Sequence, residues 1–356
     1  MSILISNLFG SCDLVLFEGS GNYLCQMMKH KLLIALCLFI FAVPLNAQKR
    51  IKPVPIIFDS DMGPDYDDVG AIAMLHAYAD SGYARILATV ASTKYEGVAA
   101  VFSVFNTYFK RPAIPIGVPK GNASELKDFQ HWTDSLLVVY PHKIKRNDEV
   151  QSSTEVYRKA LSSQPDKSVV IVTTGFLTNL ADLLQSPADK YSKLDGRELV
   201  RRKVKQLVCM GGRFPSGSEF NIRIDASASR VVAENWPTSI LFSGVEIGLR
   251  IRSGLPLIHN KSIRNSPVKD VFRICIPMKP EDSAGRMSWD ETAVLVAIKG
   301  YTPWYTIESG RIIVNSDGSN SWARDGSSHN YLTEALSPSV PEQLINKLIM
   351  HQPMRK

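Results

Sequence analysis

Acidic residues are crowded between two apolar segments: residues 59–68 hold five aspartates, and four of them, Asp59, Asp61, Asp67 and Asp68, are the informative ones. The run before them, residues 54–59, predicts a buried strand, and the run that follows predicts a helix over 67–80. Like charges at this density repel one another, so a fold that gathers them needs a cation or shared protons. Open α/β sheets bind ligands at the carboxyl ends of their strands, and hard carboxylate oxygens suit Ca²⁺ or Mg²⁺. The segment therefore predicts an acidic ligand site at the end of a strand in an α/β fold.

Short apolar runs alternate with helical patterns along the rest of the chain. The runs predict strands at 54–59, 86–91, 114–117, 168–173, 205–210 and 239–243. The helical patterns predict helices at 67–80, 95–109, 151–163, 178–185, 226–235 and 290–299. This alternation predicts an open, mostly parallel, Rossmann-like α/β sheet with helices on both faces. Residues 118–150 read as an irregular lid or rim, and residues 301–332 as a small antiparallel C-terminal appendage.

The first 47 residues have the pattern of a signal peptide. Lys29 and Lys31 precede the uncharged run LLIALCLFIFAV, and Ala47 offers a cleavage point. We interpret residues 1–47 as a signal peptide with an over-extended N-terminus, and 48–356 as a single catalytic domain. The apolar run is too short to span a bilayer comfortably, so we expect an exported protein, periplasmic or secreted, without stable membrane insertion after processing. A retained anchor is the alternative.

Charge and cysteine content exclude several classes of protein. The net charge is +7, but the basic residues are spread out, and the one local run, at 201–203, suits a solvated helix end. No interleaved aromatic and basic pattern predicts binding to a nucleic acid polymer. Beyond residue 47 the cysteines are Cys209 and Cys275, both in apolar runs, without zinc-ligand spacing.

Polar clusters follow the predicted strands, and parallel strands bring their carboxyl ends to one edge. After the aspartates come Ser92 and Thr93, then Thr173 to Gly175, Met210 to Gly212 with Glu219 and Asn221, Ser243 to Glu246, and Asp290. Together they predict one pocket for a polyhydroxylated ligand around a metal.

These motifs resemble the inosine-uridine preferring nucleoside hydrolases from about residue 55 to residue 298. The resemblance is carried by five motifs in family order: DSDMGPDYDD at 59–68, TTGFLTN at 173–179, MGG at 210–212, EFN at 219–221 and WDETAV at 289–294. It implies calcium-dependent hydrolysis of the N-glycosidic bond of a small-molecule nucleoside. It leaves the oligomeric state open, a homo-oligomer included.

The resemblance also implies roles for individual residues. Asp61 would bind Ca²⁺ and act as the catalytic base for the attacking water. Asp68, the main-chain carbonyl of Thr174, and Asp290 would complete the protein ligands of the ion. The substrate would be bound by Asp67, Thr93, Met210, Glu219, Asn221 and Trp289.

Departures from the simplest family pattern bear on the substrate. Between Gly63 and Asp67 the chain has two residues more than the simplest family pattern. Ser92 and Thr93 stand where many members carry Asn. Trp289 replaces a histidine proposed as the leaving-group acid and resembles the purine-preferring branch, in which aromatic rings stack on the base. Trp132 is a candidate for a second ring. We therefore expect a preference for purine ribonucleosides.

Two other functions fit parts of the sequence. IIFDSDMG resembles the opening of haloacid dehalogenase-type, Mg²⁺-dependent phosphatases, in which Asp59 would be the nucleophile and Asp61 the acid/base. The second alternative is an exported nucleoside- or sugar-binding protein without turnover.

Overall fold

The computed structural model describes residues 52–326 and 328–353. The predicted signal peptide, residues 1–47, lies outside these residues. The described residues belong to one compact unit, Ile51–Lys356. Within the described ranges, none of the helices combines the length and the apolar character needed to cross a bilayer.

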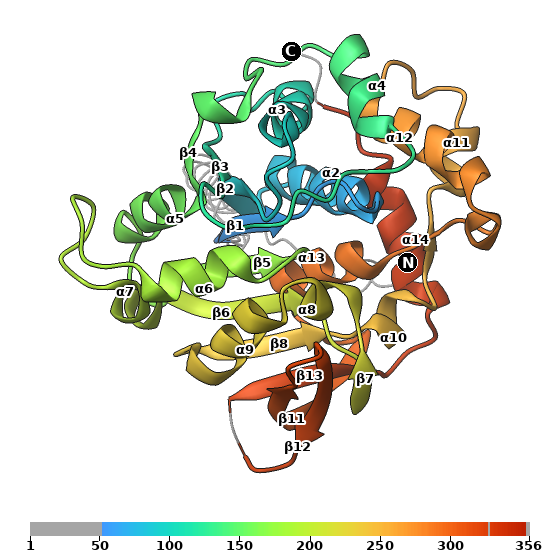
Figure 1. The fold of residues 1–356 in the computed structure, drawn as a ribbon. Helices are drawn as coiled ribbons and strands as arrows, with labels where there is room; N and C mark the ends of the chain where they lie inside the picture. Colours follow the sequence, from blue (N-terminus) through green and yellow to red (C-terminus); the bar gives the residue numbers. More distant parts are fainter. Residues whose placement is uncertain (1–51, 327, 354–356) are drawn as a thin grey trace, which may run out of the picture. The chain divides into compact units, whose positions relative to one another are not determined.

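One eleven-stranded sheet runs through this unit in the order β4-β3-β2-β1-β5-β6-β8-β13-β11-β12-β7 (Figure 1). Its strands are β1 Val54–Ser60, β2 Ala84–Ala91, β3 Ile116–Val118, β4 Gln151–Ser152, β5 Val169–Thr173, β6 Val204–Met210, β7 Ser216–Ser218, β8 Ser239–Ser243, β11 Tyr305–Val314, β12 Ser319–Ala323 and β13 His329–Glu334. All neighbours from β4 to β13 pair in parallel. The fold class predicted from the βα alternation is confirmed.

The antiparallel strands after residue 301 extend the main sheet. β11 pairs antiparallel with β13 and β12, and β12 pairs with β7. β13 then pairs in parallel with β8, so the appendage continues the sheet at one edge. A separate antiparallel pair joins β9 Arg252–Ser253 to β10 Arg286–Met287.

Helices cover both faces of the parallel part of the sheet. The helices are α2 Asp67–Asp80, α3 Val98–Tyr108, α4 Trp132–Val139, α5 Ser153–Ser162, α6 Thr178–Gln185, α7 Gly196–Lys203, α8 Phe220–Ile224, α9 Ala226–Asn235, α10 Val245–Gly248, α11 Leu255–His259, α12 Pro267–Cys275, α13 Trp289–Lys299 and α14 Ser339–Ile349. Successive residues of β1 face opposite sides: Ile56 and Phe58 belong to the core cluster that includes residues of α2, α3 and α13, whereas Ile57 belongs to the cluster that includes residues of α5, α6 and α9. This alternation follows from the two-residue period of a strand.

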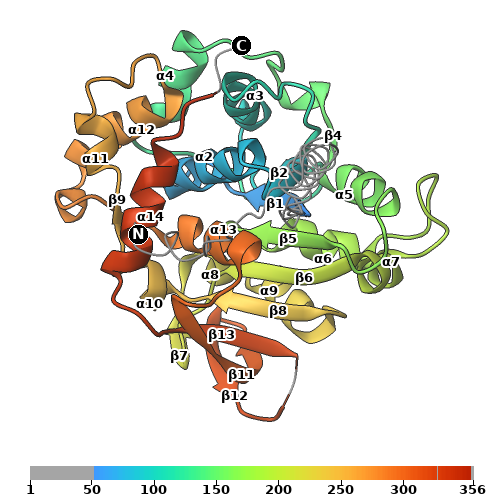
Figure 2. The same ribbon diagram turned by 180° about the vertical axis from the view of Figure 1, so that it is seen from behind.

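The helices α2 and α13 lie at the centre of one face, beside α14 (Figure 2). Nearly every residue of both helices is buried, from Asp67 to Tyr78 in α2 and from Asp290 to Ile298 in α13. A helix that is apolar all round is one enclosed by other elements. Because these two helices begin with Asp67-Asp68 and Trp289-Asp290, their packing brings those acidic first turns together.

The segment 118–150 departs from the expected irregular rim, because it contains the helix α4. Trp132, the first residue of α4, is fully buried, and its indole N–H donates to the main-chain carbonyl of Asp65. Trp132 does not line the cavity described below. The prediction that it supplies a second stacking ring for the base is therefore wrong.

Candidate active site

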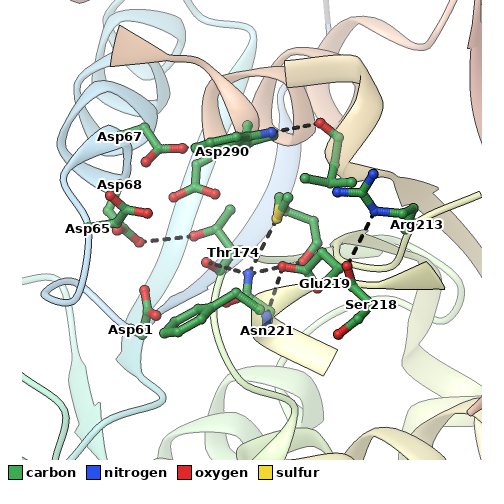
Figure 3. Close-up of a pocket in the computed structure, with 14 residues that line it drawn as sticks. Asp61, Asp65, Asp67, Asp68, Thr174, Arg213, Ser218, Glu219, Asn221 and Asp290 are labelled. Atoms are coloured by element: carbon green, nitrogen blue, oxygen red, sulfur yellow. Dashed lines mark hydrogen bonds between the residues drawn. The ribbon is translucent and has the colours of Figure 1, made fainter. Parts of the chain in front are cut away.

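A cavity of about 300 Å³ lies at the carboxyl ends of the parallel strands. The described residues that line it are Asp61, Asp65, Asp67, Asp68, Thr174, Met210, Arg213, Ser218, Glu219, Phe220, Asn221, Val245, Trp289 and Asp290. Nine of the ten site residues predicted from the sequence are among them. In Figure 3 the carboxylates of residues 61–68 lie on one side and Arg213 and Ser218 on the other, with Thr174 and Asn221 between them.

Thr93 is the predicted site residue that the cavity does not include. Its side chain is fully buried, and its hydroxyl donates to the main-chain carbonyl of Asp61 at 2.8 Å. Thr93 therefore fixes the backbone that carries Asp61 instead of contacting a ligand in the cavity. The position of Thr93 at a strand end correctly predicted that it lies near the cavity, but it did not predict the direction of its side chain.

Asp61, Asp68 and Asp290 form the acidic side of the cavity. Asp68 lies within hydrogen-bonding reach of both other carboxyls, and Ser60 Oγ donates to its Oδ1. Burial raises the pKa of Asp61 and Asp290 well above the usual range, and the neighbouring carboxylates raise both further. Burial also raises the pKa of Asp68. Without a cation these groups must share protons, because three buried like charges at this spacing are strongly unfavourable.

The donor set suits a hard divalent cation. Oδ2 of Asp68 is buried, and among the described residues only the neighbouring carboxyls are near Asp68 on that side, with no N–H or O–H donor bonded to Oδ2. Asp61, Thr174 and Asp290 bring further oxygen atoms to the same cavity. As the side chains stand, no group of three or more His, Cys, Asp or Glu within the described ranges is arranged to hold a metal ion. The case for an ion therefore rests on the oxygen chemistry and the unbalanced charge.

Glu219 and Asn221 are held by the main chain at the start of α8. The Glu219 carboxylate accepts hydrogen bonds from the backbone N–H groups of Gly212, Asn221 and Ile222 at 2.8–3.1 Å. The Asn221 amide donates to the carbonyls of Thr174 and Met210 and to the Met210 sulfur, each at 3.3 Å. Burial raises the pKa of Glu219, and the backbone donors oppose this rise. Both side chains are thereby fixed before any ligand enters.

Trp289 lines the cavity in a fixed orientation. Its indole N–H donates to the carbonyl of Val245 at 2.7 Å. Phe220, which the sequence analysis did not single out, also lines the cavity and is 39% exposed. None of the described lining residues is a histidine.

Asp59 lies in the strand next to the cavity but does not line it. Its carboxylate is fully buried and accepts hydrogen bonds from Tyr157 Oη at 2.8 Å and from Asn179 Nδ2 at 3.0 Å. A phosphatase mechanism with Asp59 as the nucleophile requires that carboxylate to reach a substrate. The structure places it out of reach, which counts against the phosphatase alternative.

Arg286, which was not predicted from the sequence, contacts the carboxylates of the cavity from behind. It is 2% exposed, and Nε and Nη2 donate to Oδ1 of Asp67 at 3.1 and 2.8 Å. It also pairs with Asp65 and lies 3.8 Å from Asp282. The signal was indirect: a cluster of buried carboxylates needs an internal cation, and Arg286 is close to Asp290 in sequence.

Comparison with known proteins gives the family. The model of the inosine-uridine preferring nucleoside hydrolases matches residues 56–328. The chain is 24% identical over 234 residues to an inosine-uridine preferring nucleoside hydrolase of Crithidia fasciculata, covering 62% of this chain and 70% of that protein. It is 29% identical over 227 residues to a pyrimidine-specific ribonucleoside hydrolase of Salmonella agona, covering 61% and 65%. The chain thus spans slightly less than two thirds of the Salmonella relative.

Solved structures share the fold. A plant nucleoside hydrolase superposes with a TM-score of 0.64 at 19% identity, covering 84% of this chain and 99% of that one. A purine-preferring ribonucleoside hydrolase from Gardnerella vaginalis gives 0.64 at 16% identity, covering 83% and 99%.

The parallel sheet, its acidic cavity and these matches define a hydrolase that acts on N-glycosyl bonds. The chain belongs to the family of inosine-uridine preferring nucleoside hydrolases.

Proposed function

We propose that this protein hydrolyses the N-glycosidic bond of ribonucleosides with the help of a calcium ion, and prefers purine bases. One observation carries the proposal: Asp61, Asp68, Thr174 and Asp290, which come from three distant parts of the chain, line a single cavity. A bound Ca²⁺ would be held by these residues and would orient the ribose diol and lower the pKa of the attacking water.

The protein's own residues then supply orientation and proton transfer. Asp61 accepts the proton of the water as the general base. Asp67, Glu219 and Asn221 bind sugar hydroxyls and present negative or dipolar groups to the cationic, oxocarbenium-like sugar of the transition state. Met210 packs against the sugar. Since Glu219 and Asn221 are already fixed by backbone hydrogen bonds, little reorganisation is needed on binding.

The purine preference rests on the aromatic side chains of the cavity. Trp289 is fixed by Val245, and Phe220 lines the same cavity, so the base has two candidate rings. Offset or edge-to-face contact with such rings contributes about 0.5–1.5 kcal/mol beyond area burial, and a purine offers the larger face. The named relatives include both purine-preferring and pyrimidine-specific hydrolases. The base preference of this protein is therefore tested by measuring its rates on both kinds of nucleoside.

The test is a nucleoside panel incubated with the protein lacking residues 1–47, with and without a chelator, with free base and ribose as the products measured. We expect inosine and guanosine to exceed uridine by about tenfold or more in kcat/KM, which corresponds to 1.4 kcal/mol. Chelation should stop turnover. Asp61→Asn should bind nucleoside but lose about 10²–10⁴-fold in kcat. Equal rates on uridine and inosine would refute the purine preference, and tight binding without release of base would favour a binding protein.

We also propose that the protein is exported and that residues 1–47 are removed, because of the signal-peptide pattern before Ala47. The mature protein would then begin at Gln48, which mass spectrometry of the exported form can check. An intact Lys29–Ala47 segment in that form would point to an anchor instead.

A further inference from the structure

Arg286 binds the carboxylates on the α2 side of the cavity without lining the cavity itself. Its Nε and Nη2 both donate to Oδ1 of Asp67, and Nη2 also pairs with Asp65. The other oxygen of Asp67, Oδ2, accepts the backbone N–H of Asp290 at 3.2 Å. Asp67 is therefore oriented from both sides, and Arg286 provides one of the two constraints.

The same guanidinium lies against two aromatic rings. Its central carbon is 4.8 Å from the ring centroid of Tyr66 and 4.9 Å from that of Trp289. Trp289 is a lining residue of the cavity, whereas Tyr66 is fully buried and its hydroxyl donates to Asp282 at 2.7 Å. Arg286 thus contacts both the Asp67 carboxylate and the Trp289 ring, two side chains that line the cavity.

The loop between Gly63 and Asp67 is built around this arginine. Its Asp65 and Tyr66 both contact Arg286. The carbonyl of Asp65 is itself held by the indole of Trp132. This loop and Arg286 therefore form one structural unit.

An arginine at this position has properties that lysine lacks. Its planar fork presents two parallel donors to one carboxylate and stacks on aromatic faces, while a lysine ammonium is a point charge on a flexible stem. A buried ion pair that loses its geometry is costly, because the remaining charge has no solvent to replace its partner. The geometry of Asp67 and Trp289 should therefore depend on the guanidinium and not on positive charge alone.

We propose that Arg286, with Asp65 and Tyr66 of the loop before α2, is a positioning residue that sets the direction of the Asp67 carboxylate and of the Trp289 ring. The inference rests on the proposed nucleoside hydrolysis, in which Asp67 binds the sugar and Trp289 the base. Arg286 acts through these two residues and does not touch the substrate.

The test is a double-mutant cycle in kcat/KM for a purine nucleoside, using Arg286→Lys, Asp67→Asn and the two together. Arg286→Lys alone should lose about 10- to 100-fold, as expected for hydrogen bonds to a charged group. In the Asp67→Asn background the same substitution should cost less than about threefold, because contacting residues are energetically coupled. Repeating the cycle with Trp289→Phe in place of Asp67→Asn tests whether Arg286 also sets the orientation of the Trp289 ring.

Arg158→Lys is the matched control. Arg158 is also 2% exposed and ion-paired, with Asp189 at 2.8 Å, but it does not line the cavity. If both lysine variants lower the melting temperature by similar amounts and only Arg286→Lys lowers kcat/KM, the effect is not general destabilisation. Asp65→Asn should change kcat/KM in the same direction as Arg286→Lys, by a smaller factor.

Additive losses in both cycles, with active unmodified protein, would overturn the positioning role and leave the proposed function intact. If the unmodified protein cleaves no nucleoside, the proposed function fails. The same cycles are then measured as calorimetric dissociation constants for inosine, where coupling supports the positioning role and additivity, or absence of binding, overturns it.

Discussion

Asp59 shows how a residue beside a site differs from a residue in it. It is fully buried, and desolvation raises its pKa to about 7, against the hydrogen bonds from Asn179 and Tyr157. Its Oδ1 has no hydrogen-bond partner among the described residues. The Asp59 side chain therefore supports the strand end next to Asp61, and its burial disfavours the negatively charged form of its carboxyl.

Asp59 should make stability depend on pH. The folded pKa of about 7 lies above the ordinary value of 3.8, so between these values the folded protein holds a proton that the unfolded chain lacks. Stability from this group is then present at low pH and is lost as the pH rises toward 7. Asp59→Asn lacks this loss, so it should gain roughly 1–4 kcal/mol relative to the unmodified protein between pH 4.5 and pH 8.

Urea unfolding at the two pH values measures this difference. Asp148→Asn, on the exposed surface, is the control for losing a negative charge as such. An Asp59→Asn variant that is less stable than the unmodified protein by the same amount at both pH values would show that the hydrogen bonds, and not the buried proton, determine the role of Asp59.

At the scale of elements, the turn after β5 is packed directly against the strand that carries Asp61. A Cβ at Gly175 would stand 2.3 Å from Ser92 Oγ and 2.4 Å from the backbone nitrogen of Asp61. Gly175 is therefore required by close approach, since any side chain must displace the backbone of Asp61, the proposed general base.

Gly175→Ala should destabilise the protein by about 1–3 kcal/mol, as overpacking does, and should also lower kcat by shifting Asp61. Thermal unfolding and single-turnover kinetics measure the two effects. Gly121→Ala is the control, because a Cβ there meets nothing within 4 Å. Normal kcat in Gly175→Ala would mean that the strand end tolerates the shift.

The elements around the site were predictable because their signals are local. The six predicted strands and six predicted helices all exist, with ends that differ by at most three residues, since apolar runs and helical periodicity reflect neighbours in sequence. The longer helices α4, α7, α12 and α14 were missed, and so were the short helices α8, α10 and α11. The start of α12 did carry a signal, because Ser266 caps the helix and Pro267 occupies its first turn.

The site was predictable to the extent that side chains follow strand ends. Nine of the ten predicted residues line the cavity. The predictions for Thr93 and Trp132 placed side chains in the cavity that do not line it, and for the same reason. A position close to a strand end or to the rim of the site does not reveal the direction of the side chain. Arg286 was missed because its partners Asp65 and Asp67 lie more than 200 residues away, and only the tertiary fold brings them together.

At the scale of the whole molecule, ion binding should couple to folding. The buried carboxyls of Asp61, Asp68 and Asp290 have raised pKa values without a cation, and they must lose protons to bind one. Calcium at 100 times its dissociation constant should add about 2.7 kcal/mol to the free energy of unfolding. The gain should be larger at pH 8 than at pH 5, since protons compete at the lower pH.

Thermal unfolding with calcium and with a chelator, at both pH values, measures this coupling. Magnesium in place of calcium tests the choice of ion, and Asp290→Asn should abolish most of the calcium-dependent shift. Identical melting temperatures with calcium and with the chelator would contradict a structural calcium site.

The pairing of β13 with β8 was not predictable, because a parallel contact between residues 239–243 and 329–334 leaves no local pattern. Local signals did predict the antiparallel strands after residue 301. They did not predict that these strands extend the main sheet and pair with β7, whose Ser218 lines the cavity.

The cavity has two walls with separate structural origins. The acidic wall is carried by β1, α2 and α13, deep in the core, whereas Ser218 belongs to β7, which is secured by the C-terminal strand β12. Arg213 is tied to β12 as well, since Asn320 accepts its backbone N–H and donates to its carbonyl. Changes in β7 and β12 can therefore alter the side of the cavity that carries Arg213 and Ser218, while the acidic side stays constrained by the packing of α2 and α13.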